Sequence, residues 1–216
     1  MRPLTPLVFL AGLPAALSLP TTSASNGNLD IPNDMIRRDS TTPDGKSITL
    51  LLHNSLTSRS GLTRRVNYPG AQPNAFMGNQ CGDSTFDSTA NADFPAIQDC
   101  SDLATGLDGM DRHWALSNGG GAGVPEWQDL VSNGNCHFYV NRKNFPDITV
   151  DGRVLVGTQD IADIVRDVVS RYSSYSTVSW GGGSIQVSHI IPAHGSMYCQ
   201  PYVPQEVPWR VQANQP

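Results

Sequence analysis

The clearest pattern of apolar and polar positions along the chain lies between residues 158 and 172. Apolar side chains recur there at helical spacing, with Asp and Arg on the other side; the apolar positions are Ile161, Ile164, Val165, Val168 and Tyr172. Asp160 and Asp163 fall near the positive end of the helix dipole. The pattern predicts an amphipathic helix with Thr158 as its N-cap.

A second helix is predicted shortly after residue 93. Its apolar face would consist of Ile97, Cys100, Leu103 and Leu107. Asp93 can cap the start, with Pro95 in the first turn. Gly109 is placed to end the helix. Cys100 would then point toward the core.

Short apolar runs bounded by Gly, Pro or Asn predict strands in the rest of the body. They are residues 114–116, 136–140, 148–150, 154–156, 185–187, 197–199 and 209–211. Asp151 and Gly152 separate two of these runs, which is typical of a tight hairpin. Strands and helices together predict an α+β fold, a two-layer sandwich in which an antiparallel sheet is covered by two helices.

The first residues resemble a secretory signal. Arg2 gives a basic start, Leu4 to Leu17 is an apolar stretch, and Ala16 and Ser18 are small residues where a signal peptidase reads the chain. We expect residues 1–18 to be a signal peptide cut after Ser18. No apolar run reaches the roughly 18 residues that suggest a membrane span, so we expect a secreted, extracellular protein.

Residues 19–78 read as a polar leader or linker, since apolar periodicity is thin apart from residues 48–52. Two Arg pairs, ending at Arg38 and Arg65, are of the kind that kexin-type proteases cut. The alternative is two ordinary exposed pairs. The folded domain is expected over residues 79–211, with residues 212–216 as a tail.

Charge is unevenly distributed between leader and body. The whole chain has 14 Lys+Arg and 19 Asp+Glu, a net charge of −5. Residues 1–65 hold 7 Lys/Arg and 4 Asp/Glu, giving +3, and residues 66–216 hold 7 and 15, giving −8. An acidic body argues against binding nucleic acid through its phosphates. A basic leader can dock on that body by charge complementarity before it is removed.

All the cysteines lie in the body, at Cys81, Cys100, Cys136 and Cys199. An even number behind a signal peptide predicts two structural disulfides formed in an oxidising compartment. No two cysteines form a C-x-x-C pair, which disfavours zinc knuckles and thioredoxin-like redox sites. The sequence leaves all three pairings open.

Motifs for known chemistry are missing from the sequence. It has no G-x-S-x-G elbow, H-E-x-x-H, phosphate-binding glycine loop or dinucleotide fingerprint. We therefore predict no catalytic residue, no cofactor and no metal site. The groups left for acid–base work are Asp83, Asp111, His113 and His137. Their clustering in one cleft would favour an enzyme, and their dispersal a binding protein.

Two other pairs of side chains have a functional and a structural interpretation. His189 and His194 are separated by five positions with Pro192 between them, a spacing that suits a loop better than a metal site. Trp127 and Trp180 each stand in a sequence near a run of glycines, where they could contact sugar or lipid. The alternative for both Trp is a buried or half-buried structural role.

Several short motifs resemble, in order, those of the fungal extracellular-protein-two effector family, also called the necrosis-inducing-factor domain. They cover about residues 79–211 and comprise Cys81-Gly82-Asp83-Ser84-Thr85-Phe86, Pro95 to Cys100, Trp114, Gly134-Asn135-Cys136-His137-Phe138, residues 156–165, Gly195-Ser196-Met197-Tyr198-Cys199 and Trp209. Trp180 to His194 departs from the pattern, because it is longer and more apolar than the expected Gly-rich approach to the last Cys. We expect an extra hairpin there.

This resemblance implies a small secreted, disulfide-bonded fungal effector or toxin-like protein. It transfers no catalytic residue. We predict a monomer that acts without catalysis, through a surface patch, on a protein or glycan of a host plant or a competing microbe. The alternative is a secreted hydrolase or carbohydrate-active enzyme. A structural cell-wall protein is a third possibility.

Overall fold

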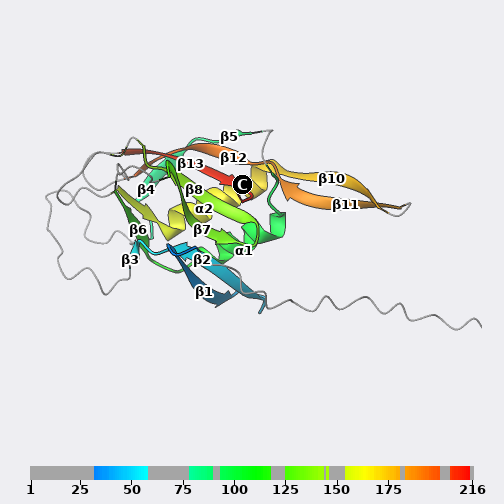
Figure 1. Ribbon diagram of the computed structural model, residues 1–216, viewed down its shortest axis with the longest axis horizontal. Coiled ribbons are helices and arrows are strands. Elements are labelled where there is room, and N and C mark those ends of the chain that lie inside the picture. The colour runs from blue at the N-terminus through cyan, green and yellow to red at the C-terminus, as the bar shows by residue number, and fades with distance from the viewer. Residues whose placement is uncertain are drawn as a thin grey trace, which may run out of the picture. The chain divides into compact units, whose positions relative to one another are not determined.

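A computed structural model of the chain describes residues 32–57, 78–89, 93–117, 125–143, 145, 154–180, 183–199 and 205–214. Its elements, shown in Figure 1, are β1 (Met35–Thr41), β2 (Ser47–His53), β3 (Leu56–Thr57), β4 (Cys81–Ser84), β5 (Asp87–Ser88), α1 (Ile97–Leu107), β6 (His113–Leu116), β7 (Trp127–Asn133), β8 (Cys136–Asn141), β9 (Val154–Gly157), α2 (Thr158–Tyr172), β10 (Ser173–Trp180), β11 (Gly183–Ile190), β12 (Ala193–Cys199) and β13 (Gln205–Gln212).

The strands form three antiparallel sheets. The largest has eight strands in the order β1-β2-β7-β8-β13-β12-β4, with β5 also paired to β12. A smaller sheet has the order β3-β6-β9, and β10 and β11 pair with each other. The structure is thus mostly antiparallel sheet with two helices and two disulfides, as the sequence predicts.

Helix α1 buries the face that the sequence predicts, with Cys100, Leu103 and Leu107 all fully buried. Its start differs from the prediction, because Ala96 rather than Asp93 is the N-cap residue. The backbone N–H of Ala96 donates to Asn135 Oδ1 at 2.9 Å. After the helix, Gly109 has a φ of +71°, a conformation that favours glycine at a helix end.

Helix α2 begins one residue earlier than a Thr158 cap would place it. Gly157 is the N-cap, and its N–H donates to the carboxylate of Asp160 at 2.9 Å. The hydroxyl of Thr158 instead donates to the carbonyl of Arg112 at 3.2 Å. The capping carboxylate therefore comes from the third helical position, where it also faces the positive end of the helix dipole.

Packing of α1 distinguishes the two faces of the eight-stranded sheet. Helix α1 contacts β2, β7 and β8. At Gly106 the helix lies so close to β2 that an added Cβ would stand 2.7 Å from Ile48 Cδ1 and 2.9 Å from Leu50 Cδ1. Ile48 and Leu50 thus face the helix, and alternation along the strand turns His53 to the opposite face.

Residues 32–57 are folded into strands, whereas the sequence predicts a polar leader or linker over residues 19–78. They form β1, β2 and β3, and β2 pairs with β7 through Leu51 and Leu52. Leu50 and Leu52 are part of the buried core. The alternating apolar positions at 48, 50 and 52 supply this edge of the sheet, so the described fold includes them although the predicted domain starts at residue 79.

Most strands that the sequence predicts in the body are present. The exception concerns the hairpin at Asp151-Gly152, whose turn and first strand lie outside the described residues. Its second strand is part of β9, which pairs with β6. Among the described residues no helix is long and apolar enough to cross a membrane.

Candidate functional site

A groove of about 630 Å³ lies between α2 and the segment around β4. The Cys81–Cys199 disulfide closes one part of it and joins β4 to β12. The charged side chains that line the groove are Asp83, Asp160, Asp163, Arg166, Asp167 and Arg171. Four carboxyl groups against two guanidinium groups make an acidic lining, which disfavours phosphate and other anions.

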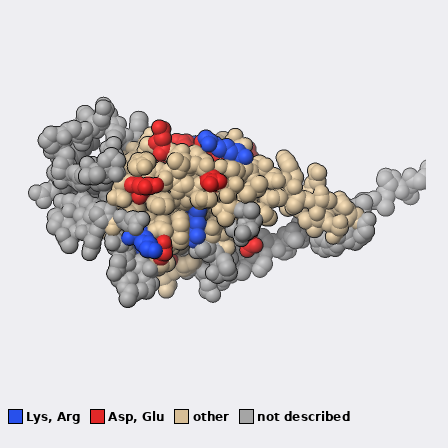
Figure 2. Space-filling model, turned by 90° about the horizontal axis from the view of Figure 1, so that it is seen from above, with Lys and Arg blue, Asp and Glu red and all other residues tan. Residues whose placement is uncertain are grey.

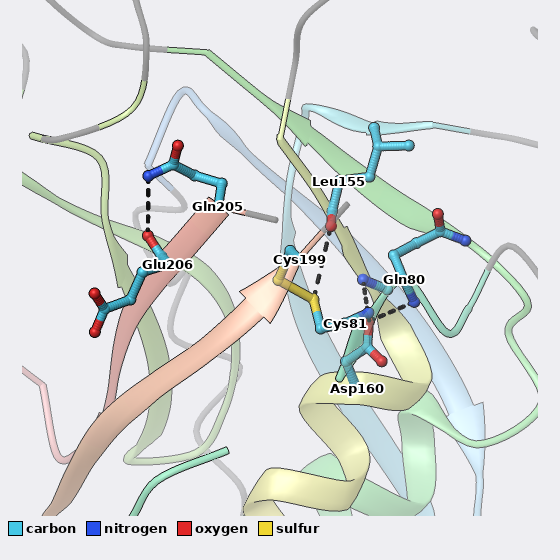
Figure 3. The surroundings of a disulfide bond; sticks show 8 residues. Gln80, Cys81, Leu155, Asp160, Cys199, Gln205 and Glu206 are labelled. Carbon is cyan, nitrogen blue, oxygen red and sulfur yellow. Dashed lines mark hydrogen bonds between the residues drawn. A yellow bond between two sulfur atoms is a disulfide. The ribbon is translucent and has the colours of Figure 1, made fainter. Parts of the chain in front are cut away.

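Asp160 connects α2 to the chain before β4 (Figure 3). Its Oδ2 accepts backbone hydrogen bonds from Gln80 at 2.8 Å and Cys81 at 3.0 Å, in addition to the one from Gly157. The residue is 8% exposed. Burial raises the pKa of Asp160 to about 6, and the three backbone donors oppose this rise.

The two arginines of the groove are engaged within the chain. Arg166 pairs with Asp163 and with Asp108, which follows the end of α1. Arg171 pairs with Asp167 at 2.9 Å and lies over the ring of Phe86, 4.2 Å from its centre. These contacts link α2 to the end of α1 through Asp108 and to the segment between β4 and β5 through Phe86.

The second disulfide, Cys100–Cys136, joins α1 to β8. The two bridges enclose sequence separations of 118 and 36 residues. By restricting the unfolded chain, loops of this size are worth about 5 and about 4 kcal/mol. The structure thereby selects one of the three pairings that the sequence leaves open.

A polar row crosses the sheet on the face turned away from α1. His137 Nδ1 lies 2.6 Å from Asp129 Oδ2, and the His137 ring stacks on Tyr139. The guanidinium of Arg210 lies between two rings, 4.2 Å from the centre of Trp127 and 4.9 Å from that of Tyr139. This row links β7, β8 and β13, so Trp127 has the half-buried structural role.

The four candidate acid–base groups occupy different surroundings. Asp83 lines the groove. Asp111 Oδ1 accepts the backbone N–H of Gly78 at 3.1 Å. His113 is buried in β6, and His137 pairs with Asp129 in the polar row. The groove therefore contains one of the four.

The paired histidines before the last Cys lie on different strands. His189, in β11, packs its ring against Phe94 at 4.5 Å. His194, in β12, places Nδ1 2.9 Å from Thr89 Oγ1. Across the part of the chain that the structure describes, no group of three or more His, Cys, Asp or Glu side chains could hold a metal ion.

The hairpin of β10 and β11 is a surface that the sequence predicts only in part. A hairpin was expected between Trp180 and His194, and the observed one begins at Ser173, directly after α2. The available signal for β10 is the presence of Tyr175, Thr177 and Val178, residue types that favour strands, directly after the helix. The side chain of Trp180 is not among those described. Large exposed apolar side chains gather on this hairpin: Tyr175, Val178, Ile185 and Val187.

The remaining predicted sites concern processing. Arg38 lies in β1, opposite Leu50 of β2. Ser18 and Arg65 lie outside the described residues.

Comparison with known proteins adds a family match to this geometry. Residues 80–199 match the model of the Hce2 family, described as pathogen effector and necrosis-inducing factor. A search of curated proteins found no match to the chain. The matched segment begins beside Cys81 and ends at Cys199, so it includes both disulfides, the hairpin and every groove residue except Asn79.

Proposed function

Because the chain belongs to the Hce2 family of pathogen effectors, we propose that it is a secreted effector that binds a host or competitor target through its surface and catalyses no reaction. The target would be a protein or glycan of a plant host or a competing microbe. The protein would act as a monomer with no cofactor.

The proposal rests on the positions of the four candidate acid–base side chains, which do not share one cleft in this fold. General acid–base catalysis needs such groups within hydrogen-bond reach of one substrate. Here His137 is engaged by Asp129 and Asp111 by the backbone of Gly78, while Asp83 stands in the groove. This arrangement favours binding over the alternative, a secreted hydrolase or carbohydrate-active enzyme.

The proposed location is extracellular. Two disulfides and membership of an effector family fit that compartment. We infer that residues 1–18 are removed as a signal peptide and that processing follows at Arg38 or Arg65. A cut after Arg38 would divide β1, whereas one after Arg65 would leave β1–β3 held to the sheet without a covalent link.

We also infer that α1 and α2 cover one face of the eight-stranded sheet as a second layer. The support is the close approach of Gly106 to Ile48 and Leu50, together with a core that includes residues of both helices. The opposite face then carries the polar row, in which His137 is 7% and Tyr139 5% exposed.

Infiltration of the purified secreted protein into plant leaves, beside a growth assay on competing fungi, tests the proposal. We expect cell death or growth inhibition in at least one assay. A sample with both disulfides reduced and alkylated is the matched control, and it should be inactive. Inactivity of the oxidised protein in both assays would contradict the effector function.

A second measurement separates binding from catalysis. We expect no release of soluble sugar or peptide from plant or fungal wall preparations. If the protein releases such products, and His137→Asn or Asp83→Asn abolishes the release while the melting temperature is unchanged, the hydrolase alternative replaces the proposal.

A further inference from the structure

The β10–β11 hairpin is attached firmly at its base and free beyond it. Ile190 is buried, and its N–H donates to the carbonyl of Pro95 at 2.9 Å. Ile191 N donates to the carbonyl of Tyr172, also at 2.9 Å. From Tyr175 to Trp180 and from Gly183 to Ser188 the strands pair only with each other among the described strands. Figure 1 shows this two-stranded ribbon extending beyond the helices.

The two faces of the hairpin differ in polarity. Val178 pairs with Ile185, and Val187 pairs with Ser176, so these three apolar side chains share one face. They are 45%, 52% and 41% exposed. The other face carries Thr177 opposite Gln186 and Ser179 opposite Ser184, with Tyr175 nearer the base. Val178 and Ile185 belong to the half of the hairpin away from the core, and Val187 lies near its middle.

Charge is missing from this part of the chain. No Asp, Glu, Lys or Arg stands between Arg171 and Glu206 in the sequence. The hairpin is accordingly tan in Figure 2, where charged residues are coloured over the rest of the visible face. Exposed edge strands usually carry Lys or another charged side chain, or a Pro, which prevents association with another strand. An exposed apolar face between two uncharged edges therefore indicates a surface that contacts another molecule when the protein acts.

We propose that this hairpin lays its Val178, Ile185 and Val187 face on the headgroup–acyl boundary of a lipid bilayer without net charge. Binding at the boundary of a neutral bilayer depends on the apolar area that is buried and does not require an ion pair with the lipid. The polar face of Ser, Thr and Gln then remains toward water. This role goes beyond the proposed function, because contact with a bilayer does not require the effector's target.

Neutral lipid is the occupant that the charges favour. Residues 66–216 carry 7 Lys/Arg and 15 Asp/Glu, a charge of −8. Anionic headgroups would repel that body within the screening length of about 8–10 Å, and the hairpin has no cation to offset the repulsion. A second copy of the chain is disfavoured by area, since a few side chains fall far short of the roughly 800 Å² that each partner buries in a stable dimer.

The contact is shallow. Each strand has eight residues, whereas a bilayer-crossing strand needs about 9–11. The outer edges of β10 and β11 also present backbone N–H and C=O groups that would lack partners in hydrocarbon. At the interface, water and headgroups can satisfy them. The hairpin therefore lies on the bilayer and does not span it.

Flotation of the secreted protein with phosphatidylcholine vesicles tests this inference. The apolar-face variant, Val178→Thr/Ile185→Thr/Val187→Thr, keeps β-branched side chains and replaces one methyl group of each Val and the ethyl group of Ile185 by a hydroxyl. Its partition coefficient should fall about tenfold or more, because each methyl or methylene group that is removed contributes a factor of about four when fully buried. The control variant Ser179→Thr/Ser184→Thr/Gln186→Thr places three threonines on the polar face and should bind within about twofold of the unaltered protein.

Vesicles in which a third of the lipid is phosphatidylserine should bind less, and added salt should restore part of the binding. The inference is overturned if the unaltered protein does not float with phosphatidylcholine, or if the apolar-face variant floats equally well. Preference for phosphatidylserine overturns it too. So does a dimer in sedimentation that the apolar-face variant abolishes, which would assign this face to a second copy. None of these results depends on cell death, so failure here is distinguishable from failure of the effector function.

Discussion

The groove at the Cys81–Cys199 disulfide and the β10–β11 hairpin lie at opposite extremes of constraint. At the groove, the disulfide joins β4 to β12, and three backbone hydrogen bonds to Asp160 hold the start of α2 against the chain at β4. The ion pair of Arg166 with Asp108 holds α2 to the end of α1. In the hairpin, Tyr175 is 69% exposed and its neighbours are uncharged. The difference separates residues that hold the fold from residues that are free to meet a partner.

Stability and function are therefore expected to respond to different substitutions. Changes in the groove should unfold the protein or shift its melting temperature. Changes on the hairpin should alter binding and leave the melting temperature nearly constant. The following predictions run from the largest expected effect on stability to the smallest.

Removal of a disulfide should destabilise the fold most. Cys81→Ala/Cys199→Ala should lower the free energy of unfolding by about 5 kcal/mol and Cys100→Ala/Cys136→Ala by about 4 kcal/mol, because the first bridge closes the longer loop. Denaturant unfolding measures both. Equal stability of either double variant and the unaltered protein would show that the bridges do not support this fold.

Adding one methyl group at Gly195 should be nearly as damaging. Its Cβ would stand 1.8 Å from the carbonyl oxygen of Thr85 and 2.8 Å from Trp209 Cζ2. Since backbone must move, Gly195→Ala should cost about 3 kcal/mol. Gly82→Ala is the matched control, because its nearest neighbour would be 3.9 Å away. Thermal melts should separate the two, and similar melting temperatures would contradict the packing described.

Asp160 should give the groove a pH dependence. Its folded-state pKa of about 6 exceeds the ordinary 3.8, so the folded protein binds more protons than the unfolded chain between about pH 4 and pH 6. The contribution of this group to stability is therefore largest below that window and falls as the pH rises through it, by about 1–3 kcal/mol.

Asp160→Asn keeps a carbonyl oxygen for the three backbone donors and removes the titration. Stability measured between pH 4 and 7 should then vary less than in the unaltered protein. Asp160→Ala should lose about 2 kcal/mol or more throughout, because the N–H groups of Gln80, Cys81 and Gly157 lose their acceptor. An unchanged pH profile in Asp160→Asn would refute the raised pKa.

The smallest effect on stability is predicted for the hairpin. The apolar-face variant should change the free energy of unfolding by no more than about 0.5 kcal/mol, because its three positions lie on the surface. Denaturant unfolding beside the polar-face control checks this. A loss of several kcal/mol would mean that the hairpin supports the fold and would remove the contrast with the groove.

Local patterns predict both helices and six of the thirteen described strands, namely β6, β8, β9, β11, β12 and β13, whereas contacts between distant segments are not visible in them. The apolar face of α2, from Ile161 to Val168, is a helical repeat and is buried as predicted. Strand β7 was missed, because Trp127 to Asn133 mixes polar and apolar residues around a bulge between Asp129 and Val131. It forms a hairpin with β8 across Gly134 and Asn135. Its other neighbour, β2, lies about 80 positions earlier in the sequence.

The candidate site shows the same limit. Cysteine number predicts two disulfides, but only the fold decides that Cys81 meets Cys199. Asp160 was expected near the helix start as a dipole partner, and its bonds to Gln80 and Cys81 depend on a segment about 80 positions earlier. The sequence shows the apolar run at residues 48–52. Its packing against α1 could not be predicted, because the flanking residues are mostly polar.

The central claim, that a disulfide-fixed body presents a separate binding surface, is tested most directly by leaf infiltration of three proteins at equal concentration. These are the unaltered protein, the apolar-face variant and the polar-face control, each with its melting temperature measured. The account predicts equal melting temperatures, with cell death from the unaltered protein and the control and a strongly reduced response to the apolar-face variant. Equal cell death from all three would contradict it.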